Sequence, residues 1–385
     1  MFTDDDRFIK RFDFILLLTT LALVFCGLIA VKSSTMSLRA GSMHYLKTQT
    51  IAFVLGLIIA FILMFIDYEI YGHLYIPIYI LSNVLLIAVV FWGYGAETWG
   101  ANNWLRLGPI SFQPSEISKF GVIIAFAKFI DVKQDVINNP LVVLQVIVVA
   151  AIPVALVMLQ EDLGTAVVFA FFLVIMIFCS GISYKYILPV AAVAAIILIA
   201  GYFFFSQKLE ECKAGDESNF RYKRIFVFLD PEFDTQGDGY QVHQARMAIG
   251  SGKIYGRGLY KGVQNQYGFI PTKQTDSIFA VWCEELGFLG GFVLIMLYAV
   301  FLSRFVRIAK HANDLFGAEI VIGLMGMFLF HILENIGMNM GMMPVTGIPL
   351  PFVSYGGTFM LLNVASVGMV ISVGLKKKRY DKYNF

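Results

Sequence analysis

Long runs of apolar residues alternate with shorter polar connections along almost the whole chain. Ten runs can be delimited, at residues 12–31, 48–66, 74–93, 116–130, 141–159, 165–182, 187–205, 277–302, 317–336 and 357–375. Most approach the length of about 20 residues that an α-helix needs to cross about 30 Å of hydrocarbon. The pattern predicts an all-α polytopic membrane protein with about ten transmembrane helices.

The composition supports this fold class and excludes a soluble globular protein. Of 385 residues, 58% are hydrophobic and only 15% are charged. The four cysteines and five histidines are scattered without the spacing of a disulfide framework or a metal site. The first apolar run has no small-residue cleavage site after it, so we expect a retained helix and not a signal peptide.

The positive charges predict the orientation in the membrane. An even number of spans places both termini on one side, and the short connections on that side carry fourteen Lys and Arg residues against five on the other. The positive-inside rule therefore predicts cytoplasmic termini for this multi-pass protein. Residues 206–276 would form a large extracytoplasmic loop within a single membrane-embedded domain, residues 1–385.

The expected outer segment at residues 337–356 is unusual because it contains three prolines and four glycines in an apolar context. Such a stretch cannot form a continuous helix. Irregular backbone at membrane depth is tolerated only where it is buried in protein or lines a cavity. We therefore expect a re-entrant segment, and no internal repeat favours an inverted-repeat transporter.

The segment 275–287 places Asp276, Glu284 and Glu285 at the start of an apolar run and inside it. Ionised groups there are costly unless they have a partner or a function. Asp276 is either an acid that caps its helix or a general base. A helix N-terminus would lower its pKa and burial would raise it, and the sequence does not decide between them. For Glu284 and Glu285 we expect structural pairing with a cation or a backbone group.

Two further acidic positions lie at expected outer helix ends. Glu116 and Lys119 are i,i+3 neighbours that either neutralise each other or present the lysine to an anion. Asp162 lies in a tight turn, where turn geometry alone would explain it. Metal coordination by Asp162 is the alternative.

The loop 206–276 is rich in basic residues and glycine. Arg224, Arg246 and Lys273 are candidates for binding phosphate, because glycine allows close backbone approach and arginine makes bidentate phosphate contacts. Attraction of a solvated basic loop to anionic lipid is the alternative. Nucleic acid is an implausible partner on the outer side of a membrane.

These segments together resemble the SEDS family (shape, elongation, division and sporulation) of polytopic peptidoglycan glycosyltransferases. The resemblance runs in order from about residue 99 to the C-terminus. The matching stretches include Gly100-Ala101, Trp104-Leu105, Gln113-Pro114-Ser115-Glu116, Lys119, Asp162-Leu163-Gly164-Thr165, Phe228-Leu229-Asp230-Pro231, Thr275-Asp276, Glu284-Glu285-Leu286-Gly287 and Pro344-Val345-Thr346-Gly347. The short N-terminal tail and the stretch 228–234 are more similar to the elongation members, RodA, than to the division members, FtsW.

The chain departs from the family pattern at two positions. Asn103 replaces an arginine before Trp104, so an anion-binding role at that position cannot be transferred, and Arg106 is our hypothesis for a substitute. Where the family commonly has Gln-Pro-Asp, this chain has Glu161 in place of the proline. Asp162 itself is retained.

The resemblance implies polymerisation of lipid II into glycan strands at the outer face of the membrane, by an inverting single displacement. It implies that Asp276 is catalytic, as the general base. We nominate as substrate-binding residues Glu116, Lys119, Asp162, Arg224, Arg246, Lys273 and Arg106. The implied partner is a class B penicillin-binding protein. No cofactor is implied with certainty, and a divalent cation (Mg²⁺ or Mn²⁺) is left open.

Two other functions fit parts of the pattern. A flippase or transporter of lipid-linked precursors would place its essential charges near mid-membrane, whereas these acids lie at the ends of their apolar segments. A non-catalytic membrane scaffold for cell-wall enzymes would tolerate loss of the Asp276 carboxylate.

Overall fold

The protein is described from a computed structural model, which covers residues 11–38, 41–95, 103–107, 110–213, 223–230, 233–234 and 237–376. Gly100, Ala101 and Pro231, which carry part of the family resemblance, lie outside these ranges. The described chain is almost entirely helical, in agreement with the predicted fold class.

Helices account for nearly all of the regular structure, and one short hairpin accounts for the rest. The longer helices are α2 (Phe14–Thr35), α3 (Gly41–Phe65), α5 (Tyr75–Trp92), α7 (Pro114–Lys133), α8 (Pro140–Met158), α9 (Leu163–Cys179), α10 (Tyr184–Lys213), α12 (Asp238–Ser251), α14 (Ile278–Lys310), α15 (Leu315–Met340) and α16 (Gly357–Leu375). The short elements are α4 (Glu69–His73), β1 (Leu105–Leu107), β2 (Ile110–Phe112), η1 (Gln134–Val136), α11 (Lys223–Leu229) and α13 (Val263–Gln266).

Each of the ten predicted apolar segments corresponds to one of the longer helices. Seven of them are long and apolar enough to cross a membrane by length and composition, namely α2, α3, α5, α8, α14, α15 and α16. Leu163–Cys179 is apolar but shorter. The chain is therefore a multi-pass membrane protein.

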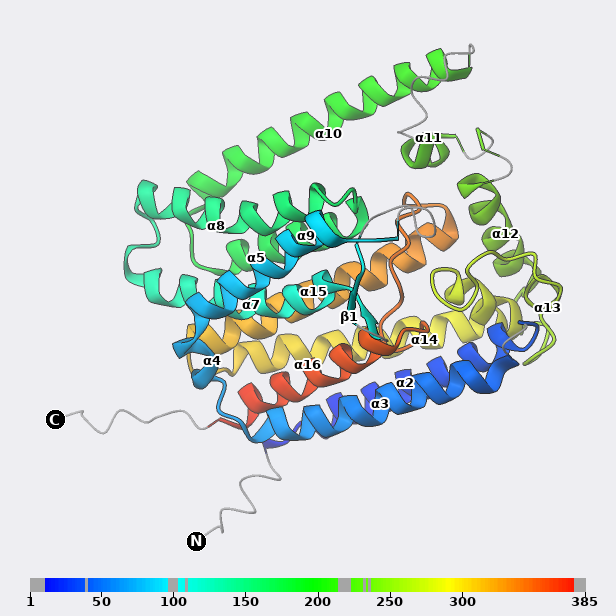
Figure 1. The fold of residues 1–385 in the computed structure, drawn as a ribbon, viewed down its shortest axis with the longest axis horizontal. Coiled ribbons are helices and arrows are strands. Elements are labelled where there is room, and N and C mark those ends of the chain that lie inside the picture. Colours follow the sequence, from blue (N-terminus) through cyan, green and yellow to red (C-terminus); the bar gives the residue numbers. More distant parts are fainter. Residues whose placement is uncertain are drawn as a thin grey trace, which may run out of the picture.

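The helices pack into a bundle (Figure 1). Helices α15 and α16 are the most enclosed, with 72% of their most apolar windows buried, against 17% for α3. Large apolar side chains face outward, among them Phe61, Phe91 and Leu188. Outward apolar side chains are expected where the surrounding solvent is hydrocarbon.

The two ends of the bundle differ. Helices α11, α12 and α13 lie together at one end, away from the start of α2 and the end of α16 (Figure 1).

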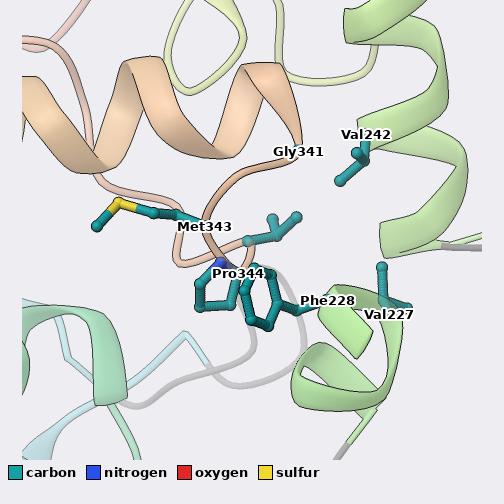
Figure 2. A pocket seen from close by; sticks show the side chains of 7 residues that line it. Val227, Phe228, Val242, Gly341, Met343 and Pro344 are labelled. Atoms are coloured by element: carbon teal, nitrogen blue, oxygen red, sulfur yellow. The ribbon is translucent and has the colours of Figure 1, made fainter. Parts of the chain in front are cut away.

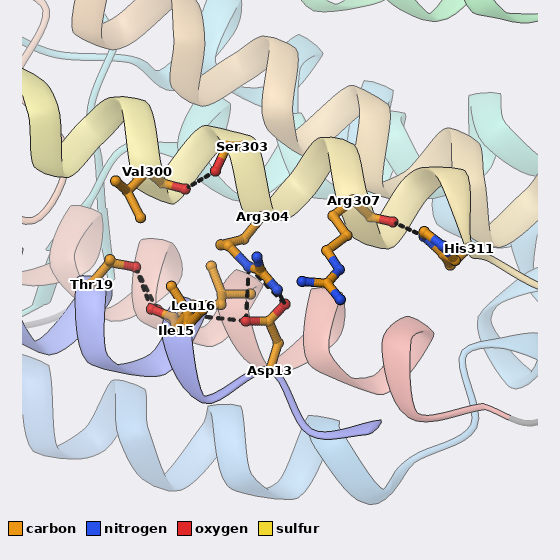
Figure 3. A network of polar contacts seen from close by, with 9 residues as sticks. All are labelled: Asp13, Ile15, Leu16, Thr19, Val300, Ser303, Arg304, Arg307 and His311. Carbon is orange, nitrogen blue, oxygen red and sulfur yellow. Dashed lines mark hydrogen bonds and ion pairs between the residues drawn. The ribbon is translucent and has the colours of Figure 1, made fainter. Parts of the chain in front are cut away.

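An ion pair lies at the other end, where α2 starts. There, Arg304 of α14 binds the carboxylate of Asp13 through Nε and Nη2, and the Nη2–Oδ2 distance is 2.7 Å (Figure 3). Asp13 also caps α2 by accepting a hydrogen bond from the backbone N–H of Leu16. This ion pair therefore joins the first and the eighth predicted spans.

Of the segment 337–356 that was predicted to be irregular, residues 337–340 are still helical and end α15, because the first proline is Pro344. Residues 341–356, which we call the Pro/Gly segment, are irregular as predicted. Gly341 ends α15 in the left-handed conformation at φ 73°. Leu350, Phe352 and Val353 are fully buried in the bundle core. The hydroxyl of Tyr298 donates a hydrogen bond to the carbonyl of Pro351 over 2.5 Å, so part of the irregular backbone is bonded to the bundle. The irregular backbone is thus buried in protein, which is the condition under which non-helical backbone is tolerated at membrane depth.

The predicted loop 206–276 is more ordered than expected. Its first residues continue α10 as far as Lys213, where Lys208 and Glu211 form an i,i+3 ion pair at 2.5 Å. Such a pair supports helix beyond the apolar stretch. The loop also contains α11, α12 and α13. The hairpin β1–β2, in which Arg106 pairs with Ser111, was likewise not predicted.

Candidate active site

Asp276 lies immediately before α14, and it is not the helix cap. The N-cap position belongs to Ser277. The carboxylate is therefore available for another role, and the interpretation of Asp276 as a capping acid is wrong. The physical reason is that α14 begins at Ile278, so the acid lies one residue outside the capping position.

The backbone around Asp276 is held from two directions. Its carbonyl oxygen accepts hydrogen bonds from the side-chain amides of Asn335 and Asn339 of α15, both over 2.9 Å. The preceding carbonyl, of Thr275, accepts a hydrogen bond from the hydroxyl of Ser354 over 2.6 Å. The carbonyl of Gln274 accepts one from the N–H of Tyr355. These bonds hold the main chain from which the Asp276 side chain projects.

The Asp276 carboxylate lies in a partly buried environment that changes its acidity. Burial raises its pKa from an ordinary 3.8 to about 6, while a hydrogen bond from Thr275 and the charge of Arg224 act in the opposite direction. A β-carbon at Gly347 would lie 3.7 Å from Oδ2 of Asp276, so the Pro/Gly segment passes close to the carboxylate. An acid with this pKa is mostly ionised at neutral pH and more basic than an exposed aspartate.

Four consecutive residues of the Pro/Gly segment, Thr346–Pro349, connect the parts of the site; we call them the connector. The hydroxyl of Thr346 donates to Glu334 over 2.8 Å, and the carbonyl of Ile348 accepts from Asn335 over 2.8 Å. Gly347 adopts φ +75° and passes Asp276, and the carbonyl of Pro349 lies 3.3 Å from Nδ1 of His331. The connector therefore contacts Asp276 and three polar residues of α15.

The predicted pair Glu116 and Lys119 forms as expected and is buried. Nζ of Lys119 lies 2.8 Å from Oε1 of Glu116 and 3.1 Å from Nε2 of His331. Lys119 is only 1% exposed. The neutralising ion pair is therefore confirmed, and Lys119 also contacts His331, whose ring lies against the connector. Presentation of Lys119 to an anion stays a prediction.

Asp162 caps α9 and is heavily hydrogen-bonded. Its Oδ1 accepts a hydrogen bond from the backbone N–H of Thr165 over 2.9 Å. Its Oδ2 accepts one from the Thr165 hydroxyl over 2.9 Å and one from the side-chain amide of Asn103 over 2.6 Å. Asn103, the departure from the family pattern, thus donates to the retained aspartate. A β-carbon at Gly164 would lie 2.9 Å from the carbonyl of Thr346, so this turn abuts the connector.

The four other nominated cations occupy different environments. Lys273 is buried and donates to the hydroxyl of Ser37 and to the carbonyl of Asn265, each over 2.6 Å, and burial lowers its pKa. Arg224, on α11, is exposed and acts on the charge of Asp276. Exposed Arg246 and Arg106 lie on α12 and β1, and Cδ of Arg246 would be 3.2 Å from a β-carbon at Gly341. The charge of Arg224 acts to lower the pKa of Asp276, so this cation lies within electrostatic reach of the carboxylate.

Glu284 and Glu285 pair with backbone and side-chain groups of the loop, as predicted. Glu284 accepts hydrogen bonds from the N–H groups of Gln264 and Asn265, over 2.7 and 3.1 Å. Glu285 accepts from the N–H of Tyr260 over 3.0 Å and from the hydroxyl of Ser33. The two acids therefore hold residues 260–265 against α14 and α2.

An apolar pocket opens between α11, α12 and the start of the Pro/Gly segment (Figure 2). It is lined by Val227, Phe228, Val242, Gly341, Met343, Pro344 and Val345. Arg224 lies on the same helix as Phe228, and Arg246 reaches Gly341. The pocket thus combines an apolar lining with cations at its margin.

Sequence reasoning missed His331, Glu334, Asn335 and Asn339. His331, Asn335 and Asn339 follow an i, i+4, i+8 spacing, which places them on one face of α15. A polar stripe inside an apolar helix is costly unless it has partners, and that is the signal that could have identified it.

The open question of a divalent cation can be tested against the donors present. Within the described part of the chain, no group of three or more His, Cys, Asp or Glu residues could hold a metal ion. Asp162 already accepts hydrogen bonds on both oxygens. Participation of a divalent cation therefore stays a prediction.

Comparison with known proteins gives matches over nearly the whole chain. Residues 13–379 match the FtsW/RodA/SpoVE family model, described as "Cell cycle protein". The chain is 37% identical to the peptidoglycan glycosyltransferase MrdB of Escherichia coli K12, over 85% of each chain. It is 34% identical to a probable peptidoglycan glycosyltransferase FtsW of Trichlorobacter lovleyi, over 96% of this chain and 95% of that protein. A solved chain of a peptidoglycan synthase complex matches with a TM-score of 0.74 at 28% identity, covering 96% of this chain and 99% of that one.

Proposed function

Because this chain belongs to the FtsW/RodA/SpoVE family, we propose that it is a peptidoglycan glycosyltransferase that polymerises lipid II with Asp276 as the general base. Proteins named as peptidoglycan glycosyltransferases are 34% and 37% identical to it. The observation that carries the assignment of the base is the held, partly buried carboxylate of Asp276.

The chemistry requires a base more than an acid. The anomeric carbon of a lipid II donor already bears a diphosphate, which is a good leaving group. The acceptor is a sugar hydroxyl, which is too weak an acid to attack unassisted at neutral pH. In the proposed step Asp276 removes the proton of that hydroxyl as its oxygen attacks the anomeric carbon, and the bond to the diphosphate breaks. One displacement inverts the configuration, and no covalent intermediate with the protein forms.

The charge that develops on the diphosphate needs cations in a site from which water is largely excluded. Arg224 is the first candidate because its charge acts on Asp276. Arg246 and Arg106 are further candidates, and Lys119, with Glu116 beside it, would act from the buried side of the connector. Asp162 would support the site through the turn that contacts Thr346. Lys273 donates to Ser37 and Asn265, neither of which belongs to the connector, so we assign it the least direct role.

The polyprenyl tail of the substrate needs an apolar surface beside the reacting groups. The pocket between α11, α12 and residues 341–345 offers such a surface at the same end of the bundle as the loop helices (Figure 2).

The proposal places the protein in the bacterial cytoplasmic membrane with both termini in the cytoplasm and α11–α13 outside. The excess of positive charge in the short connections at the termini end supports this orientation. A role in elongation and cell shape is part of the proposal, and the likeness to MrdB supports it.

We further propose a class B penicillin-binding protein as partner. The supporting observation is the likeness to a chain of a peptidoglycan synthase complex. In such an assembly the transpeptidase would cross-link the strand that this chain polymerises. The chain alone would then have low activity, and full activity without a partner in a defined membrane would contradict this part.

The test of the function compares wild type with Asp276→Asn, each purified with the penicillin-binding partner and supplied with lipid II. The substitution keeps the shape of the side chain and the backbone bonds to Asn335 and Asn339. Loss of glycan polymer from an intact complex would support the assignment. Undiminished polymer would place the base elsewhere, and absence of polymer from wild type would favour a transporter or a scaffold.

A further inference from the structure

The imidazole of His331 connects the buried Lys119–Glu116 pair to the connector. It lies on α15 and is 2% exposed. Nε2 is 3.1 Å from Nζ of Lys119, and Nδ1 is 3.3 Å from the carbonyl oxygen of Pro349. One ring thus joins α7 to the segment that passes Asp276.

The partners determine which nitrogen carries the proton. A lysine ammonium has only donors, so Nε2 must accept the hydrogen bond from Lys119. A carbonyl oxygen can only accept, so Nδ1 must carry the hydrogen that points to Pro349. The ring is therefore neutral, in the Nδ1–H tautomer, while Lys119 keeps its charge beside Glu116.

The Lys119 ammonium is enclosed by these groups and by one aromatic ring. Nζ lies 5.9 Å from the centroid of Phe359, and the His331 ring lies 5.4 Å from the same centroid. Lysine carries a long flexible side chain, and holding it in one direction removes an entropy cost that binding would otherwise incur. The direction of Nζ is set chiefly by Glu116 and His331.

We propose that His331 is a positioning residue. It holds the Lys119 ammonium at a fixed position relative to the connector, and thereby relative to the substrate. This inference rests on the proposed function, in which Lys119 helps to bind the diphosphate of lipid II. If His331 only filled space in the core, any side chain of similar volume could replace it without loss of substrate binding.

The substitutions His331→Gln and His331→Leu separate the two roles. Glutamine offers an acceptor oxygen to Lys119 and a donor N–H to Pro349, whereas leucine fills the space and offers neither. The matched control is Glu319→Gln, a buried polar change on the same helix. Both carboxylate oxygens of Glu319 are without a hydrogen-bond partner among the residues that the structure describes.

The experiment measures lipid II binding, KM and kcat for each variant in the intact complex with the penicillin-binding partner. We expect His331→Leu to weaken lipid II binding and raise KM by about tenfold or more, as for loss of a hydrogen bond to a charged group. His331→Gln should stay within about threefold of wild type, and Glu319→Gln should match wild type. Equal behaviour of the Gln and Leu variants would overturn the proposal.

A double-mutant cycle with Lys119→Met tests whether His331 acts through the lysine. If it does, His331→Leu costs little further binding once the ammonium is absent. Full additivity would overturn the proposal. Lipid II binding is also measured for the Asp276→Asn complex. Binding reports on the proposed role of Lys119 and His331 even if Asp276 is not the base, so the two hypotheses can fail separately.

Discussion

The side-chain amide of Asn335 donates hydrogen bonds both to the carbonyl oxygen of Asp276, over 2.9 Å, and to that of Ile348, over 2.8 Å. One side chain of α15 therefore fixes the proposed base and the connector relative to each other. Asn339, one turn further on, makes a second bond to the same Asp276 carbonyl. Asp276 is thus held through its own backbone, and its carboxylate accepts a hydrogen bond from Thr275.

Replacing Asn335 by aspartate should impair catalysis without removing any proposed substrate contact. Both hydrogen bonds would be lost, and a carboxylate would face two carbonyl oxygens. We expect the polymerisation rate to fall by about 10²-fold, the size of effect that a 1 Å misplacement produces. The matched control is Asn363→Ala on α16, a buried asparagine whose Nδ2 has no partner among the residues that the structure describes. A rate loss that the control shares would contradict the prediction.

The rate should depend on pH through Asp276. The base must be ionised, and its pKa is about 6. We therefore expect initial rates to rise as pH increases through about 6 and to level off above about 7. Initial rates of the complex between pH 5 and 8 would measure this. A profile that stays flat across that range would show that the base is another group.

Asp276→Asn should not lower stability at neutral pH. Because burial raises the pKa, the folded protein binds this proton more tightly than the unfolded chain, and stability falls as pH rises from about 4 to 6. At pH 7 the ionised carboxylate costs at most about 3 kcal/mol, and asparagine removes that cost. Thermal unfolding in detergent should give a Tm equal to or above that of wild type at pH 7.5. A clear decrease would mean that the carboxylate makes stabilising contacts.

Glu284 should be required for stability of the loop. Glu284→Ala leaves the buried N–H groups of Gln264 and Asn265 unpaired, at a cost of about 1–3 kcal/mol each. We expect a lower Tm and faster proteolysis within residues 252–268, with a smaller effect for Glu284→Gln, which keeps one acceptor oxygen. Unchanged proteolysis in Glu284→Ala would argue against this role.

The ion pair between Arg304 and Asp13 should affect stability alone, because it joins the start of α2 to the C-terminal part of α14, at the opposite end of the bundle from α11–α13 (Figure 1). The two side chains are 15% and 10% exposed, so Arg304→Met leaves a poorly solvated carboxylate. We expect a loss of about 1–3 kcal/mol in unfolding free energy. Polymerisation per folded complex should equal that of wild type, and a reduced specific rate would indicate coupling between the two ends.

The sequence alone was sufficient for the helices and for the local pairing of Glu116 with Lys119. Apolar length is a local property, and hydrocarbon thickness converts it directly into a helix, so each of the ten predicted segments is helical. The pairing of Glu116 with Lys119 follows from their i,i+3 spacing on one helix. The irregular character of residues 341–356 follows from proline and glycine chemistry, and the choice of Asp276 followed from the family resemblance.

The tertiary structure decided which distant residues meet. The bonds from Asn335 and Asn339 to Asp276, and from Asn103 to Asp162, span 59, 63 and 59 residues, and local patterns carry no signal for such pairs. The acidity of Asp276 was also undecided in sequence, since the helix terminus and burial act in opposite directions. Burial outweighs the hydrogen bond from Thr275 and the charge of Arg224, which both lower the pKa. The acid also lies outside the capping position of α14. Sequence thus determined the helices and the chemical groups, and packing determined their partners and their basicity.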